Sequence, residues 1–272
     1  MDNRLPMKIE WPDPLPSATL NGMAQTFDEL VDEADAVSVD GWEFSWLDGR
    51  ATEERPSWGY SRLLADRMAE ATAALDIQTG GGEVLAGLPR LAELTVATES
   101  WPPNIARARH HLGPRGVTVV ADDDEPPLPF DDASFDLVVS RHPVTAWWAE
   151  IARVLRPGGR YFSQQVGMGS VHEVSEYFLG PFTPDPGRSP ELAGKNAEAH
   201  GLVVTDLRHE SLRTVFHDVG AVVYFLRKVI WIVPGFTVEK YRAKLAELHD
   251  RIQSDGPFVA HTERFLIEAR KP

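Results

Sequence analysis

A regular alternation of strand-like and helix-like segments between residues 74 and 166 constrains the fold of this chain more than any other feature. Short runs of apolar and β-branched residues predict five strands, and segments with apolar residues at helical spacing lie between them. The predicted strands are 74–77, 93–99, 117–122, 135–141 and 160–166, and the predicted helices are 61–73, 82–92, 103–113 and 143–156. Alternating strands and helices require right-handed crossovers, which place helices on both faces of a parallel sheet. The sequence therefore predicts an α/β protein with a Rossmann-like, doubly wound core.

The composition excludes several classes of function. The formal net charge is −14 and no basic patch interrupts it, so nucleic acid is an unsuitable partner. The chain has no cysteine, which removes disulfides, thiolate metal sites and a cysteine nucleophile, and we expect a cytoplasmic protein with no metal site. No apolar run approaches the roughly 20 residues that span a bilayer, so we expect no membrane partner. The oligomeric state stays open.

The sequence LDIQTGGGE, residues 75–83, ends a predicted strand in a glycine turn and places Asp76 just before it. Glycines at this position let a ligand approach the backbone at the start of the next helix. The Asp76 carboxylate would repel a pyrophosphate there, whereas it suits a ligand with a cationic centre and an ammonium group. S-adenosylmethionine has both groups and no phosphate.

Over residues 74–167 the sequence resembles the class I S-adenosylmethionine-dependent methyltransferases with small-molecule-type domains. The first motif of that family, an acid followed by three alternating glycines, corresponds here to Asp76, Gln78, Gly80 and Gly82, so Gln78 departs from the pattern. The run RVLRPGGRYF, 153–162, is similar to the family's late fold marker. The resemblance implies S-adenosyl-L-methionine as the cofactor and a seven-stranded sheet whose last strand, within 257–272, is antiparallel.

The resemblance also implies which residues bind the cofactor. Glu99 ends the second strand 23 positions after Asp76, where the family places the acid that binds both ribose hydroxyls. A carboxylate suits that task because it accepts two O–H donors at once. Counting from the end of the third strand assigns the adenine amino group to Asp122 with the backbone of Asp123, whereas counting back from Leu128 assigns it to Asp124. The remaining predicted contacts are Thr79, Ser100, Ser140 and Arg141.

The implied reaction is transfer of a methyl group to an oxygen or nitrogen of a small molecule. His142 follows the fourth strand directly, and it could accept a proton from an alcohol or amine. It could equally cap the helix predicted from Pro143 or position the cofactor. The chain lacks the Asn- or Asp-Pro-Pro-aromatic motif of amino-methylating nucleic-acid enzymes.

The predicted domains are an N-terminal arm and aromatic cap segment over 1–60 and a methyltransferase domain over 61–272. A helical insertion at about 214–255 interrupts the second domain and is predicted to select the substrate. We expect 214–236 and the aromatic loop 41–60 to cover the cofactor's methyl group. Candidate pocket-lining residues, for which core packing is the alternative, are Trp42, Phe44, Trp46, Trp58, His217, Tyr224 and Trp231.

Two other functions remain open from the sequence. The glycines and Glu99 also fit an NAD-dependent oxidoreductase, although Leu85 occupies the third glycine position of that fingerprint and Asp76 opposes a pyrophosphate. The chain could also keep the cofactor, or only the fold, without transferring a methyl group.

Overall fold

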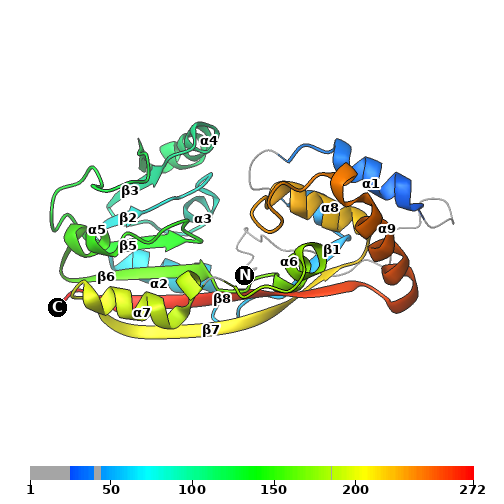
Figure 1. Ribbon diagram of the computed structural model, residues 1–272. Helices are drawn as coiled ribbons and strands as arrows, with labels where there is room; N and C mark the ends of the chain where they lie inside the picture. The colour runs from blue at the N-terminus through cyan, green and yellow to red at the C-terminus, as the bar shows by residue number, and fades with distance from the viewer. Residues whose placement is uncertain (1–24, 40–43, 185) are drawn as a thin grey trace, which may run out of the picture. The chain divides into compact units, whose positions relative to one another are not determined.

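The computed structural model describes residues 25–39, 44–184 and 186–272. In this part of the chain eight strands form one mixed sheet in the order β1-β7-β8-β6-β5-β2-β3-β4 (Figure 1). The strands are β1 (Ala51–Glu53), β2 (Ala73–Asp76), β3 (Leu94–Glu99), β4 (Thr118–Ala121), β5 (Phe135–Arg141), β6 (Leu155–Val166), β7 (Val203–Phe216) and β8 (Phe258–Arg270). The helices are α1 (Phe27–Ala36), α2 (Tyr60–Glu70), α3 (Glu83–Ala86), α4 (Pro102–Leu112), α5 (Trp148–Val154), α6 (His172–Leu179), α7 (Pro190–Ala199), α8 (Val219–Lys228) and α9 (Val238–Asp255).

The described residues form two compact units. The sheet unit comprises 56–168, 186–210 and 263–272, and the helical unit comprises the described residues up to 55, 169–184 and 211–262. Two of the boundaries between the units fall within β7 and β8, and the others fall between elements, after Arg55, Met168 and Pro184. The domain boundary predicted near residue 60 stays a prediction.

In the sheet unit, β2 lies at the centre of a parallel arrangement. It pairs with β3 on one side and β5 on the other, and β4 and β6 extend the parallel order outward. Because these strands run in one direction, their carboxyl ends meet at one edge of the sheet. The acids and polar residues that follow the strands are therefore gathered along that edge.

Helices cover both faces of this sheet. Residues of α2 and α4 pack with Leu137, Val139 and Phe162 on one face. Residues of α5 and α7 pack with Val138 and Tyr161 on the other. Successive residues of a strand point to opposite faces, so β5 contributes to both cores. The predicted doubly wound α/β fold is thus confirmed, and so is an antiparallel last strand, because β8 pairs antiparallel with β6.

Several details differ from the sequence prediction, including the start of β6, which is Leu155 instead of residue 160. The sheet has eight strands instead of seven, because β1 pairs antiparallel with the end of β7. The helix predicted from Gly82 to Ala92 is limited to α3, which ends before Pro89. The helix predicted from Pro143 begins only at Trp148.

The helical insertion predicted at about 214–255 contains α8 and α9, which lie with α1 and α6 in the helical unit. The core of this unit contains apolar residues of α1, α6, α8 and α9, and α8 is buried along most of its length. Residues 1–24 of the predicted arm and aromatic cap segment, and Trp42 within it, lie outside the described residues. Phe44, Trp46 and Tyr224 pack on this core, and Trp231 is 55% exposed. No helix in the described part of the chain is long and apolar enough to cross a membrane.

Close packing of α1 on α8 depends on Gly220. A Cβ at this position would lie 2.7 Å from the carbonyl oxygen of Leu30 and 3.0 Å from Asp218 Oδ1. Gly194 in α7 is a matched helical glycine, since a Cβ there would meet Leu207 at an ordinary 3.7 Å.

We therefore expect Gly220→Ala to lower the free energy of unfolding by about 1–3 kcal/mol through overpacking. Gly194→Ala should leave it unchanged or raise it by up to about 1 kcal/mol, because alanine favours a helix interior. Urea unfolding followed by circular dichroism measures both. Equal stability of the two variants would contradict the role assigned to Gly220.

Candidate functional site

The turn that follows β2 is held tightly by the surrounding backbone. Gly80 and Gly82 have φ values of 65° and 80°, in the left-handed region that favours glycine. A Cβ on Gly82 would lie 2.8 Å from Leu112, so α4 packs directly against the turn. At the entrance, Thr79 Oγ1 donates a hydrogen bond to Asp76 Oδ2 at 2.6 Å.

Glu99, the last residue of β3, fastens this turn. Its Oε2 accepts the Gly80 N–H at 2.7 Å. Its Oε1 accepts the N–H groups of Ser100 at 3.1 Å and Trp101 at 3.0 Å. The carboxylate is buried, and three backbone donors stabilise its charge. An ionised carboxylate has about four acceptor sites, so Oε2 keeps capacity for a ligand donor.

Asp76 is buried beside Glu99. Burial disfavours its charged form and raises its pKa to about 7, with a further contribution from the negative charge of Glu99; the Thr79 hydroxyl partly offsets this. At neutral pH this carboxyl is therefore poised between its two protonation states. A cationic ligand would stabilise the ionised state.

Four backbone donors of the glycine turn bond to groups within the protein. Gln78 N–H donates to Thr98 Oγ1 at 3.3 Å, and Thr79 N–H donates to the Thr98 carbonyl at 2.9 Å. Gly80 N–H donates to Glu99, and Gly82 N–H to the Thr79 carbonyl at 3.3 Å. A pyrophosphate-binding turn presents such N–H groups to its ligand. This turn uses four of them internally.

The Gln78 side chain connects two other loops at the same edge. Its Nε2 donates to Asp124 Oδ1 at 2.8 Å and to the Thr145 carbonyl at 2.9 Å. Its Oε1 accepts the N–H of Val144. Gln78 itself has φ 59°, which is uncommon for a residue with a side chain. We name this set of contacts the Gln78 clasp.

The three adjacent aspartates after β4 have different environments. Burial raises the pKa of Asp124 to about 6 despite its bond from Gln78, and Asp122 and Glu99 add to the effect. Asp122 Oδ2 accepts the N–H of Asp124 at 3.3 Å, and burial raises the pKa of Asp122 as well. Asp123 is exposed. Trp147 Nε1 donates to the Asp124 carbonyl at 2.9 Å, which ties this loop to the segment after β5.

Two of the residues predicted at the end of β5 face different neighbours. Ser140 is buried, and its Oγ lies 2.8 Å from the Tyr161 hydroxyl and 3.0 Å from Ser163 Oγ. His142 has φ 55°, and its Nε2 lies 3.0 Å from Gln164 Nε2. The structure therefore places His142 at the edge, and Ser140 within the sheet.

The hydrogen bonds around Gln164 identify the tautomer of His142. Trp58 Nε1 can only donate, and it lies 2.8 Å from Gln164 Oε1. This fixes the amide orientation, so Gln164 Nε2 donates to Nε2 of the imidazole and the ring proton lies on Nδ1. The pKa of His142 lies well below its ordinary value because of burial, with the charges of Arg141 and Arg264 adding to the effect. His142 is therefore neutral near pH 7.

Sequence reasoning named Trp58 as a candidate pocket-lining residue but did not single out Tyr60, Gln164 or Arg264 as neighbours of this site. Tyr60 donates to the Ser140 carbonyl at 3.2 Å, and its ring stacks on Phe162 with centroids 5.1 Å apart. Trp58 is separated from Gln164 by 106 residues, so no local pattern could indicate their contact.

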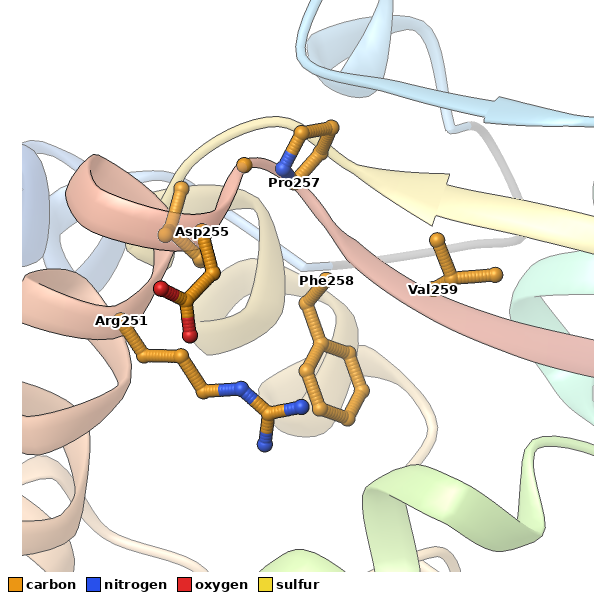
Figure 2. Close-up of a pocket in the computed structure, with 7 residues that line it drawn as sticks. Arg251, Asp255, Pro257, Phe258 and Val259 are labelled. Carbon is orange, nitrogen blue, oxygen red and sulfur yellow. The ribbon is translucent and has the colours of Figure 1, made fainter.

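Two cavities lie in the described part of the chain, and only the second includes a residue of the Gln78 clasp, Thr145. Figure 2 shows one in the helical unit, of about 180 Å³, around the turn from α9 to β8. Its lining residues are Arg251, Ile252, Asp255, Gly256, Pro257, Phe258 and Val259. The other, of about 330 Å³ in the sheet unit, lies beside α5 and is bordered by Trp147 and Trp148.

Residues 75–163 match a family model described as a methyltransferase domain. The match shows a methyltransferase domain in this part of the chain, in agreement with the resemblance inferred from the motifs. No curated protein matches the chain.

Solved structures share the fold at low sequence identity. A candidate methyltransferase from Bacillus halodurans C-125 is 20% identical with a TM-score of 0.57, and the match covers 78% of this chain and 98% of that one. The YcgJ protein from Bacillus subtilis is 18% identical with a TM-score of 0.55, covering 78% and 97%. A functionally unknown protein from Deinococcus radiodurans R1 is 16% identical with a TM-score of 0.56, covering 82% and 91%. These likenesses establish the fold alone.

The raised pKa of Asp76 predicts a pH-dependent stability. The folded chain holds this proton more tightly than an unfolded chain, whose aspartate has a pKa of about 3.9, so stability falls as pH rises from about 4 to about 7. Asp76→Asn removes this penalty while it keeps an acceptor for Thr79. Relative to the unmodified chain, the variant should gain about 2–3 kcal/mol of unfolding free energy between pH 5 and pH 8. Urea titrations at the two pH values measure this difference, and a constant difference would contradict a raised pKa.

Proposed function

We propose that this protein is an S-adenosylmethionine-dependent methyltransferase that acts on an oxygen or nitrogen of a small molecule. The observation that carries the proposal is the pairing of a buried Asp76 carboxyl with a glycine turn that uses four of its N–H groups within the protein. This combination opposes a pyrophosphate and favours a cationic ligand without phosphate. The methyltransferase-domain match over residues 75–163 supports the same cofactor.

The residues present fit S-adenosylmethionine. Asp76 has a hydrogen bond from the Thr79 hydroxyl and no cationic partner among the described residues, and its remaining oxygen suits the cofactor's ammonium group. Glu99 Oε2 can accept a ribose hydroxyl in addition to the Gly80 N–H. We assign adenine recognition to the loop of Asp122, Asp123 and Asp124. Thr79, Ser100, Ser140 and Arg141 remain proposed contributors to the site.

When bound, the cofactor supplies a methyl group already activated on a sulfonium. The chain then needs to align the acceptor and exclude water more than to activate a leaving group. A neutral His142 retains one imidazole lone pair, which is the requirement for a general base. That lone pair receives the N–H of Gln164, so an acceptor would have to compete with this bond. As a base, His142 would serve an alcohol, a phenol or a protonated amine.

The acceptor is proposed as a small molecule because the net charge of −14 disfavours nucleic acid. We propose that the insertion at about 214–255 selects it. A second candidate function is cofactor binding without methyl transfer, and the hydrogen bond that engages the His142 lone pair favours it.

Calorimetry with the cofactor product tests the proposed function. We expect the chain to bind S-adenosylhomocysteine more tightly than NAD. Glu99→Ala should weaken binding about 10- to 100-fold, because a hydrogen bond to a charged group contributes roughly 1.5–3 kcal/mol. Glu93→Ala, an exposed acid just before β3, is the matched control and should bind normally. Tight NAD binding with none for S-adenosylhomocysteine would overturn the proposal.

Variants of His142 test the general-base role. His142→Ala should lower turnover by about 10²- to 10⁴-fold while leaving cofactor affinity nearly unchanged. His142→Gln should be almost as slow with an alcohol or phenol acceptor and nearly normal with a neutral amine. Single-turnover transfer of a labelled methyl group measures the rate, and calorimetry measures the affinity. Unchanged turnover in both variants would contradict the general-base role of His142. Alignment of the acceptor with the cofactor would then have to explain the rate.

A further inference from the structure

Gln78 occupies a position where the class I resemblance places a glycine. Its φ of 59° lies in the left-handed region, which a side chain disfavours. Residues in such conformations persist when the surrounding structure holds them, and they cluster at ligand sites and switches. Here the holding contacts are made by the Gln78 side chain itself.

The clasp uses both N–H donors of the carboxamide and an acceptor site of its oxygen. The Nε2 group donates to Asp124 Oδ1 at 2.8 Å and to the Thr145 carbonyl at 2.9 Å, and Oε1 accepts from Val144 N–H. All three partners belong to loops at the carboxyl ends of β4 and β5. Gln78 therefore joins the two loops across the end of β2.

The edge of the carboxamide that carries the oxygen and the adjacent N–H resembles one edge of adenine. A primary carboxamide places an N–H donor beside a carbonyl acceptor, and adenine places its amino N–H beside the ring acceptor N1 in the same order. The carboxamide donates to Asp124, one of the aspartates to which the resemblance assigns the adenine amino group. A glutamine side chain thus satisfies a carboxylate that a bound adenosine would otherwise satisfy.

We propose that Gln78 is an affinity-determining gate, whose carboxamide takes the place of the adenine edge on Asp124 until the cofactor displaces it. The inference rests on the proposed function, because it requires an adenosyl ligand. Since binding requires the open clasp, the apparent affinity equals the intrinsic affinity reduced by the open fraction. Ligands without an adenine-like edge gain nothing in exchange for opening the clasp.

The opposite role is physically reasonable and predicts the opposite result. If Gln78 only positioned the two loops for the cofactor, its removal would weaken binding. The direction of the change in affinity therefore separates a gate from a positioning residue.

The test is calorimetric titration of S-adenosylhomocysteine into the full chain and its variants. Gln78→Gly removes the carboxamide and suits the left-handed backbone, and it should bind about 10-fold tighter through loss of a competing hydrogen bond to a charged group. Gln78→Asn tolerates the same backbone but is one methylene shorter, so it should bind more tightly than the unmodified chain as well. Ala133→Gly is the control, because Ala133 has φ 53° in a different loop and should bind normally.

Deuterium exchange at the Val144 amide provides a readout independent of binding. Without ligand this N–H should exchange faster in Gln78→Gly than in the unmodified chain, because its acceptor is lost. Equal exchange, or unchanged or weaker binding by both Gln78 variants, would overturn the gate and leave the proposed function intact. Absence of binding by the folded unmodified chain and by both Gln78 variants would overturn the proposed function with it. Binding by Gln78→Gly alone would support a gate that is closed in nearly all molecules.

Discussion

The candidate site depends on the hydrogen bonds that the Glu99 carboxylate accepts from the backbone. This carboxylate joins the end of β3 to the turn after β2 by accepting N–H groups from both segments. Backbone donors that are removed from water must find partners, and the sharp turn offers few carbonyls for this. With Gly80 held by Glu99, the chain can reverse direction and begin α3 against α4. Asp76 and Gln78, on either side of Ile77, then take the positions that determine their chemistry.

Much of the sheet unit is readable from local sequence pattern. Periodicity locates β5 at its observed bounds and β2, β3 and β4 within one residue, because burial on both faces of a parallel sheet leaves a continuous apolar run. The sequence also locates the acids at the strand ends. Pro143 was a wrong helix start for a long-range reason: the N–H of Val144 and the carbonyl of Thr145 are bonded by Gln78, 66 and 67 residues earlier. The Thr145 carbonyl is thereby diverted from the N–H four residues later, which it would accept in a helix.

Side-chain connections across the fold are the part that sequence could not supply. The series from Trp58 through Gln164 to His142 determines which imidazole nitrogen carries the proton. It depends on which way an amide is turned, and only the packed structure defines that orientation. Arg141 and Arg264 further favour the neutral ring. The sequence identifies His142 from its place after β5. The structure adds that its ring is neutral and that its lone pair already accepts a hydrogen bond from Gln164.

The near-neutral pKa of Asp76 makes its charge responsive to what the site contains. A permanently ionised carboxylate would destabilise the folded chain, because its charge would always be buried. Asp76 is instead protonated in about half of the molecules near pH 7. Arrival of a cation would expel that proton, and departure of the cation would draw one back from solvent. The ammonium group that we assign to Asp76 is present in both S-adenosylmethionine and S-adenosylhomocysteine, so the carboxyl would stay ionised from binding of the cofactor until release of its product. Asp76 would therefore release one proton to the solvent when the ligand binds and take one up when it leaves, once in each cycle of ligand turnover.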